Sequence, residues 1–229
     1  MEKIIENLGL VRQRIASACL RSGRNVNEIE IVAVTKTVPP ERIELAIQAG
    51  IRQIGENRVQ EAAAKKPRVH SRATWHMVGH LQTNKVGKAL QLFDMIQSVD
   101  SLHLAEKLQE QCEKLGCDIE VLIQVNTSGE ETKFGVAPAD TFSIVKDIAH
   151  FPALKIKGLM TIGPLTYEEE KIRQSFSLLR NLFLEIDAAH LPAVEMKILS
   201  MGMTDDFEIA IEEGATMLRL GRAIFGERN

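Results

Sequence analysis

Aromatic residues are scarce in this chain of 229 amino acids, which has one tryptophan, one tyrosine and an aromatic content of 4%. Proteins that bind single-stranded nucleic acid stack the bases on aromatic side chains, so this shortage argues against that class. Basic residues are not in excess either, because 28 lysines and arginines stand against 31 acidic residues. The net charge of −3 therefore predicts no binding of nucleic acid or of an anionic membrane surface.

Cysteine is also rare, with only Cys19, Cys112 and Cys117. Three thiols cannot all pair, and the spacing of Cys112 and Cys117 without a nearby histidine matches no zinc site. No apolar run approaches the roughly 18 residues of a membrane span, and the first residues alternate charged with apolar side chains instead of forming a signal peptide. We expect free thiols, no metal, no membrane association and a cytoplasmic location.

The chain does have the composition of a folded globular protein, at 45% hydrophobic and 26% charged residues. Apolar residues recur at helical spacing over the first twenty positions, and after them short apolar runs alternate with helical patterns. The predicted strands are 30–35, 52–55, 74–78, 94–99, 119–125, 155–160, 195–199 and 216–220. The predicted helices between them are 40–49, 58–66, 84–90, 101–115, 138–150, 168–190 and 205–213.

This alternation is typical of a parallel sheet with right-handed crossovers. Eight strands in a chain of this length predict an α/β fold, a (β/α)8 TIM-type barrel with an extra N-terminal helix, in which residues 1–229 form one domain. A doubly wound open sheet is the alternative, because periodicity does not determine closure. Thr166 and Glu169 have the spacing of a capping box ahead of the longest helix.

In such a barrel the reactive groups stand at the C-terminal ends of the strands. Lys36 follows the apolar run 31–35, and strand alternation places it on the same face as Val32 and Val34. If that face lines the barrel, the amine is partly desolvated and its neutral, Schiff-base-forming state is favoured. The alternative is a surface lysine that merely follows a strand.

Two glycine-containing segments follow the last two predicted strands, SMGMTDD at 200–206 and RLGRAIFG at 219–226. TIM barrels commonly bind phosphate in these two loops, through glycine N–H groups, a hydroxyl and the N-terminus of a short helix. The residues that supply such groups here are Ser200, Gly202, Gly221 and Arg222. The alternative is that the glycines only permit tight turns.

Arg219 alternates with Met217 on the last predicted strand. If Leu218 faces the outer helices, Arg219 points into the barrel, where a charge is costly without a partner. A Schiff-base lysine, a phosphate site and an inward arginine on neighbouring strands match what pyridoxal 5′-phosphate (PLP) needs. These needs are an amine for its aldehyde, donors for its phosphate and a partner for its ring nitrogen.

Five segments of the sequence are distinctive: AVTK at 33–36, GENRVQE at 55–61, WHMVGHLQTNK at 75–85, LSMGM at 199–203 and RLGRAIFG at 219–226. Together they resemble the pyridoxal phosphate homeostasis protein family. The resemblance covers nearly the whole chain and implies a barrel related to the N-terminal domain of alanine racemase, with PLP on Lys36. It also implies Asn57 near the cofactor ring, Ser200, Gly221 and Arg222 at the phosphate, and Arg219 at the pyridine nitrogen.

Three other positions receive structural interpretations. We interpret His80 as a hydrogen-bonding loop residue in preference to an acid or base, and His76 as a packed histidine in preference to a ligand. The segment 133–135, Lys-Phe-Gly, is interpreted as part of a solvated loop in preference to a cofactor contact.

The resemblance to alanine racemase bears on catalysis, because racemisation there needs a second base, a tyrosine, opposite the lysine. Tyr167 is the only tyrosine, and we expect it at the start of a helix with a structural role. An arginine at the ring nitrogen also weakens the electron sink that amino-acid chemistry requires.

We therefore predict a non-catalytic, monomeric PLP-binding protein that buffers or delivers the cofactor in vitamin B6 and amino-acid homeostasis, with apo PLP enzymes as recipients. The alternative is a PLP-dependent racemase or lyase of unknown substrate. A third hypothesis is an aldolase that uses Lys36 on a phosphosugar without a cofactor, which visible absorbance of the purified protein separates from the other two.

Overall fold

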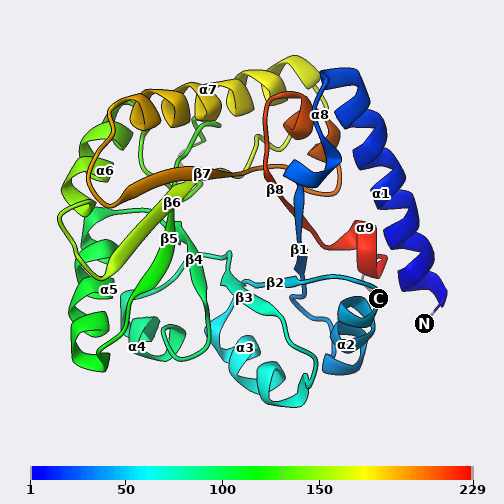
Figure 1. The fold of residues 1–229 in the computed structure, drawn as a ribbon, viewed down its shortest axis with the longest axis horizontal. Helices are drawn as coiled ribbons and strands as arrows, with labels where there is room; N and C mark the ends of the chain where they lie inside the picture. The colour runs from blue at the N-terminus through cyan, green and yellow to red at the C-terminus, as the bar shows by residue number, and fades with distance from the viewer. Residues whose placement is uncertain (1, 131, 228–229) are drawn as a thin grey trace.

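Eight parallel strands close into a barrel in the computed structural model, which describes residues 2–130 and 132–227 (Figure 1). The strands follow one another around the barrel in chain order, and β1 pairs with β8 to close it. Their bounds are β1 (Glu30–Val34), β2 (Gln53–Glu56), β3 (Thr74–Met77), β4 (Met95–Val99), β5 (Ile119–Gln124), β6 (Leu154–Met160), β7 (Val194–Ser200) and β8 (Met217–Leu220).

Helices connect the strands on the outside of the barrel. The α-helices are α1 (Glu2–Ser22), α2 (Pro40–Gln48), α3 (Val59–Lys65), α4 (Val86–Ala89), α5 (Leu102–Leu115), α6 (Thr141–Ile148), α7 (Glu169–Ala188), α8 (Phe207–Glu212) and α9 (Arg222–Phe225). Short 3-10 turns are η1 (Val26–Glu28), η2 (Lys66–Arg68), η3 (Thr83–Lys85) and η4 (Pro138–Asp140). None of the helices in the described part of the chain is long and apolar enough to cross a lipid bilayer.

The barrel predicted from the sequence is confirmed, and the pairing of β1 with β8 excludes the open sheet. Each predicted strand is present to within one residue at either end. The predicted capping box is wrong: α7 begins at Glu169 after the N-cap Glu168, which forms no side-chain cap. Thr166 Oγ1 instead accepts a hydrogen bond from the Glu168 N–H at 3.1 Å, so it organises the turn before the helix.

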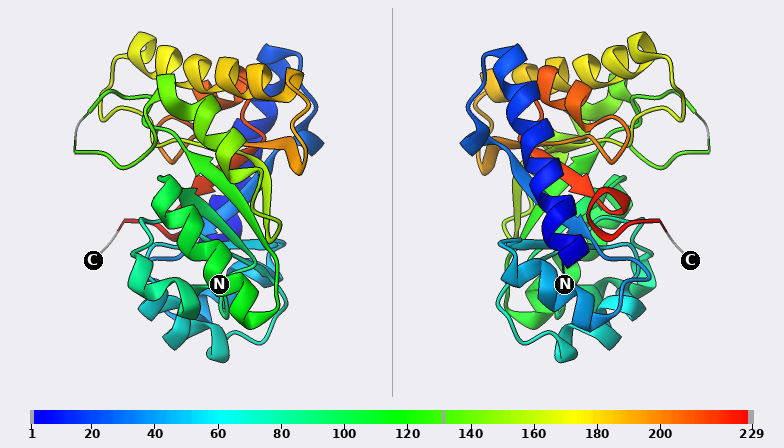
Figure 2. Two further views of the ribbon diagram at one scale, coloured as in Figure 1. Left: turned by 90° about the vertical axis from the view of Figure 1, so that its left-hand side faces the viewer. Right: turned by 90° about the vertical axis from the view of Figure 1, so that its right-hand side faces the viewer.

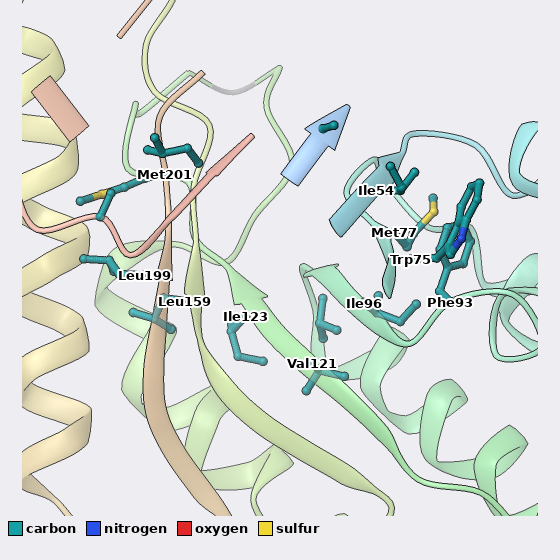
Figure 3. Packing of buried hydrophobic residues seen from close by; sticks show 14 of the residues in the cluster. Ile54, Trp75, Met77, Phe93, Ile96, Val121, Ile123, Leu159, Leu199 and Met201 are labelled. Atoms are coloured by element: carbon teal, nitrogen blue, oxygen red, sulfur yellow. The ribbon is translucent and has the colours of Figure 1, made fainter. Parts of the chain in front are cut away.

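Alternate residues of each strand face two different apolar layers. The outward-facing residues, such as Leu218 and Leu220, join the large core between the sheet and the helices, part of which Figure 3 shows. Inward-facing Val32 and Met217 belong to a smaller cluster inside the barrel. This alternation directs the side chain of Arg219 inward, as the sequence predicts.

The N-terminal helix α1 covers the helices that follow the last two strands. It runs beside α8 and α9 (Figure 1) and buries Ile4, Leu8, Val11, Ile15 and Ala18. Polar contacts add to this packing, because Asn7 Nδ2 donates to the Ile224 carbonyl at 2.9 Å and Arg14 pairs with Glu208 at 2.7 Å. The extra helix therefore supports the loops after β7 and β8.

The loops after β5 and β6 project together from the side of the barrel where the strands end (Figure 2). Lys133 Nζ joins them by donating to the Gly163 carbonyl at 2.8 Å. Two side-chain amides also hold the loop after β5. Gln124 donates to the Phe134 carbonyl, and Asn126 donates to the carbonyls of Glu130 and Lys133. This loop is thus packed and hydrogen-bonded against the barrel.

Candidate cofactor site

Lys36 lies in a tight turn directly after β1. The turn is closed by the hydrogen bond from the Val38 N–H to the Thr35 carbonyl at 2.9 Å. Thr37, the third residue of the turn, has a φ of 65°, in the left-handed region that a β-branched residue normally avoids at a cost of about 1–2 kcal/mol. Lys36 itself is partly buried, so the turn presents the amine between the barrel and solvent.

A hollow of about 260 Å³ opens beside this turn. Its wall includes three of the residues predicted from the sequence, Lys36, Gly221 and Arg222, together with Arg42 from α2. Gly221 stands close to β1, since a Cβ on it would lie 3.4 Å from the Val34 carbonyl oxygen. Closure of the barrel thus brings the end of β8 next to the reactive lysine.

Arg222 and Arg42 give this hollow a positive wall. Arg222 is half exposed and pairs with the Asp205 carboxylate, which lies at the surface. Arg42 donates to the Phe225 carbonyl, which ties α2 to α9 across the hollow. A carboxylate near a phosphate site would repel the anion, and here the charge of Asp205 is offset by Arg222.

Arg219 points into the barrel and is 4% exposed. Its Nη1 donates to Ser200 Oγ at 2.7 Å and its Nη2 to the Thr161 carbonyl at 2.6 Å. Burial lowers the pKa of Arg219 to about 10, which leaves it a cation at neutral pH. Among the described residues its hydrogen bonds go to neutral groups, and the buried Asp206 carboxylate opposes the lowering of the Arg219 pKa without forming an ion pair with the guanidinium.

Ser200 connects Arg219 to a polar chain that crosses the barrel interior. Its hydroxyl donates to Gln97 Oε1 at 2.7 Å. The Gln97 amide nitrogen in turn lies 2.9 Å from His76 Nδ1, so the amide donates to the ring. The one proton of Ser200 is therefore used by Gln97, and in this arrangement the hydroxyl has none left for a phosphate oxygen.

Gly202 and Asn57, also predicted from the sequence, lie outside the hollow beside Lys36. Gly202 has a φ of 92° and packs under α8, because a Cβ there would come within 2.6 Å of the Ala210 Cβ. Asn57 lines a separate hollow of about 590 Å³ at the ends of β2 and β3, with His80 and Lys85. The structure thus places these two residues around the barrel mouth and not against Lys36.

His80 makes the kind of hydrogen bond expected of a loop residue. Its Nδ1 lies 2.8 Å from the Asp100 carboxylate, and its ring stacks on Phe134 at a centroid distance of 3.8 Å. Through Phe134, the loop after β5 therefore contacts the loop after β3 at the barrel mouth. Lys133 is held by Glu130 and Gly163, away from this stack.

His76 is packed inside the barrel, as the sequence predicts, at 1% exposure. Burial lowers its pKa to about 4, so the ring is neutral at physiological pH. Within the described residues its Nε2 has no hydrogen-bond partner. Among those same residues no group of histidine, cysteine and acidic side chains could hold a metal ion.

Sequence reasoning did not single out several residues that shape the site: Arg42, Glu56, Lys65 and Gln97. Two of them could have been found in the sequence, because each is a polar residue in or at the end of an apolar strand. Gln97 interrupts the apolar strand β4 at a fully buried position, and Glu56 ends β2 in the same way. Arg42 and Lys65 lie on helices where a cation is ordinary, so nothing in the sequence sets them apart.

The fold and this site define a barrel of the alanine racemase N-terminal type, and the family model "Alanine racemase, N-terminal domain" matches residues 8–229. A pyridoxal phosphate homeostasis protein from Aquifex aeolicus is 42% identical over 224 residues, 97% of each chain. The chain belongs to the pyridoxal phosphate homeostasis protein family.

Solved structures agree with this assignment. A protein from Bifidobacterium adolescentis superposes with a TM-score of 0.94 at 40% identity, covering 98% of this chain and 95% of that one. PipY of Synechococcus elongatus, solved with PLP bound, superposes with a TM-score of 0.81 at 36% identity, covering 94% of this chain and all of PipY.

Proposed function

We propose that this protein binds PLP reversibly at the barrel mouth, with Lys36 as its covalent anchor, and that it buffers or delivers the cofactor without catalysing a reaction of its own. When bound, PLP supplies an aldehyde that condenses with a lysine amine. The family relatives named for PLP homeostasis and the PLP bound to PipY support this assignment.

The observation that carries the proposal is the buried Arg219, whose hydrogen bonds within the described residues go to neutral groups, with the Asp206 carboxylate acting on it without a direct ion pair. A buried guanidinium costs free energy unless a charged or strongly accepting group meets it. The pyridine nitrogen of PLP is such an acceptor. Because the pKa of Arg219 remains about 10, the guanidinium keeps its protons at neutral pH and donates a hydrogen bond without protonating the ring.

The residues around Lys36 fit the rest of the cofactor. Arg42 and Arg222 provide positive charge in the hollow that Lys36 lines, and a phosphate dianion needs such charge. We place the phosphate there, with Gly221 allowing its close approach. Ser200 is then assigned to hold Arg219 through its hydrogen bond, and Gly202 to pack α8, while Asn57 lies at the ring side of the mouth.

A spectroscopic titration followed by reduction tests this function. Apoprotein titrated with PLP should develop a visible absorbance band, and borohydride reduction followed by peptide mapping should place the cofactor on Lys36. Lys36→Ala should lose the band and change the unfolding free energy by less than about 1 kcal/mol, because Lys36 is only partly buried. Label on Lys85, Lys133 or another lysine would refute the assignment.

Delivery is tested by transfer to a recipient. Loaded protein mixed with an apo PLP enzyme should restore the activity of that enzyme. Repeating the experiment with a trap that removes free PLP from solution should separate direct transfer from release. A loaded protein that never gives up its cofactor would contradict buffering and delivery.

One observation favours a second candidate function, a racemase or lyase. The pairing of His80 with Asp100 has the geometry that orients a general base, and His80 stands at the mouth. Tyr167, by contrast, is fully exposed in the loop before α7. If a reaction occurs, His80→Asn should abolish it and Tyr167→Phe should leave it unchanged.

A further inference from the structure

We propose that Lys65, on α3, is a positioning residue for Lys36. Its ammonium group joins the carboxylates of Glu56 and Glu61 into a clasp, the set Glu56, Glu61 and Lys65, that holds both residues flanking Lys36. The inference rests on the proposed function, because it explains how the anchor for PLP is presented.

The clasp grips the residue before Lys36 through two groups. Lys65 Nζ donates to the Thr35 carbonyl at 2.8 Å. It also donates to Glu56 Oε1 at 2.8 Å, and the same oxygen accepts from Thr35 Oγ1 at 2.6 Å. Thr35 and Glu56 are both fully buried, so water does not compete for these bonds.

The same ammonium group also holds Thr37, the residue after Lys36, through the Glu61 carboxylate. Lys65 Nζ donates its third hydrogen bond to Glu61 Oε2 at 2.8 Å, and this oxygen accepts from the Thr37 N–H at 3.0 Å. That bond fixes the amide of the one residue in the turn with a positive φ. Strained backbone of this kind persists where surrounding contacts over-determine it, which is common at functional sites.

The chemistry of the clasp requires a lysine at position 65. An ammonium has three donors, and here each of them has an acceptor in a different part of the chain: directly after β1, on β2 and on α3. Burial raises the pKa of Glu56, and its hydrogen bonds with Lys65 and Thr35 act against that rise. Lys65 is therefore committed to structure, which separates its role from that of Lys36.

The test compares two neighbouring lysines. Lys65→Met removes the clasp. Lys66→Met is the matched control, because it removes a hydrogen bond to the Leu92 carbonyl and a contact with the Trp75 ring and leaves the clasp intact. Lys36 in the apoprotein is trace-labelled with acetic anhydride, and its labelling rate across pH is read by peptide mass mapping. A displaced turn should shift the rate and pH profile of Lys36 in Lys65→Met and weaken PLP binding by about tenfold or more, with no change in Lys66→Met.

A milder variant separates positioning from folding. Glu61→Ala keeps the buried pair of Lys65 with Glu56 and removes the bonds of Glu61 to Thr37 and to Lys65. It should stay folded by circular dichroism and still weaken PLP binding by about threefold or more. Glu41→Ala, which breaks a fully surface-exposed pair with Arg68, should bind PLP as the unaltered protein does.

Unchanged Lys36 labelling and unchanged PLP affinity in folded Glu61→Ala and Lys65→Met would overturn the clasp. A failure of the proposed function looks different, because the unaltered protein would then bind no PLP at Lys36. The acetylation profiles of the apoproteins would still decide whether Lys65 positions Lys36.

Discussion

Arg219 Nη1 donates a hydrogen bond to Ser200 Oγ across 2.7 Å, between the ends of two adjacent strands. Ser200 can accept this bond because its own proton is donated to Gln97. The donors in this series of hydrogen bonds therefore all point from Arg219 toward His76. The guanidinium is held in one orientation inside the barrel. We therefore expect Ser200 to stabilise the folded apoprotein in addition to any role in the cofactor site.

Ser200→Ala and Arg222→Ala should therefore have different effects on the stability of the apoprotein. Ser200→Ala leaves a buried N–H of Arg219 and the Gln97 Oε1 without partners, so the free energy of unfolding should fall by about 1–3 kcal/mol. Arg222→Ala removes a half-exposed ion pair with Asp205 and should change it by less than about 1 kcal/mol. Urea unfolding of the two apoproteins measures both effects.

Arg222→Ala should instead weaken PLP binding by one to two decades, since a charge-assisted bond to phosphate contributes about 1.5–3 kcal/mol and a decade is about 1.4 kcal/mol. Its affinity for pyridoxal, which lacks the phosphate, should not change. Equal affinities of the unaltered protein for PLP and pyridoxal would show that the phosphate does not bind at Arg222.

His76 should make the stability of the protein depend on pH. Its folded-state pKa of about 4 lies below the ordinary 6.5, so the unfolded chain takes up the proton first as the pH falls. Stability that is complete above pH 6.5 is therefore lost between about 6.5 and 4, by about 3 kcal/mol.

His76→Gln should remove this part of the pH dependence while keeping an acceptor for Gln97. The control is His103→Gln, because His103 lies on the surface with a 78% exposed side chain. Urea unfolding at several pH values gives the difference between each variant and the unaltered protein. A His76→Gln profile parallel to that of the unaltered protein would contradict the buried neutral histidine.

Gly202→Ala should destabilise the fold more than Gly129→Ala. Both glycines have a positive φ, so each substitution carries backbone strain of about 1–2 kcal/mol. Only the Cβ at position 202 meets neighbours, 2.6 Å from the Ala210 Cβ, and overpacking adds about 1–3 kcal/mol. Equal losses of unfolding free energy in the two variants would mean that α8 can move away freely.

Incubation of the PLP-loaded protein with amino acids in deuterium oxide should produce no deuterium at Cα beyond the rate of free PLP. The reason is the proposed contact of Arg219 with the ring nitrogen, which would leave that nitrogen unprotonated and so weaken carbanion stabilisation. Mass spectrometry of each amino acid measures the exchange. Rapid exchange with one amino acid that disappears in Lys36→Ala would establish the enzyme alternative.

The sequence by itself determined the secondary-structure elements and indicated Lys36 and Arg219, the two residues to which we assign the aldehyde and the ring nitrogen of PLP. Apolar periodicity of two and of 3.6 residues is local, so it placed the eight strands and their helices without knowledge of the fold. Lys36 and Arg219 followed from the same rule, because alternation along a strand sets the direction of a side chain once the core face is known. The capping box at Thr166 failed because its spacing is equally compatible with a turn before the helix.

Only the tertiary structure decided which side chains meet. Gln97 and Ser200 are 103 residues apart, and Lys65 and Thr35 are 30 apart, so their hydrogen bonds depend on strand register and barrel closure. Closure likewise joined Gly221 to the Lys36 turn, while the packing of α8 took Gly202 away from it. Contacts of this kind arise from the geometry of the whole barrel, which the local pattern of residues does not encode.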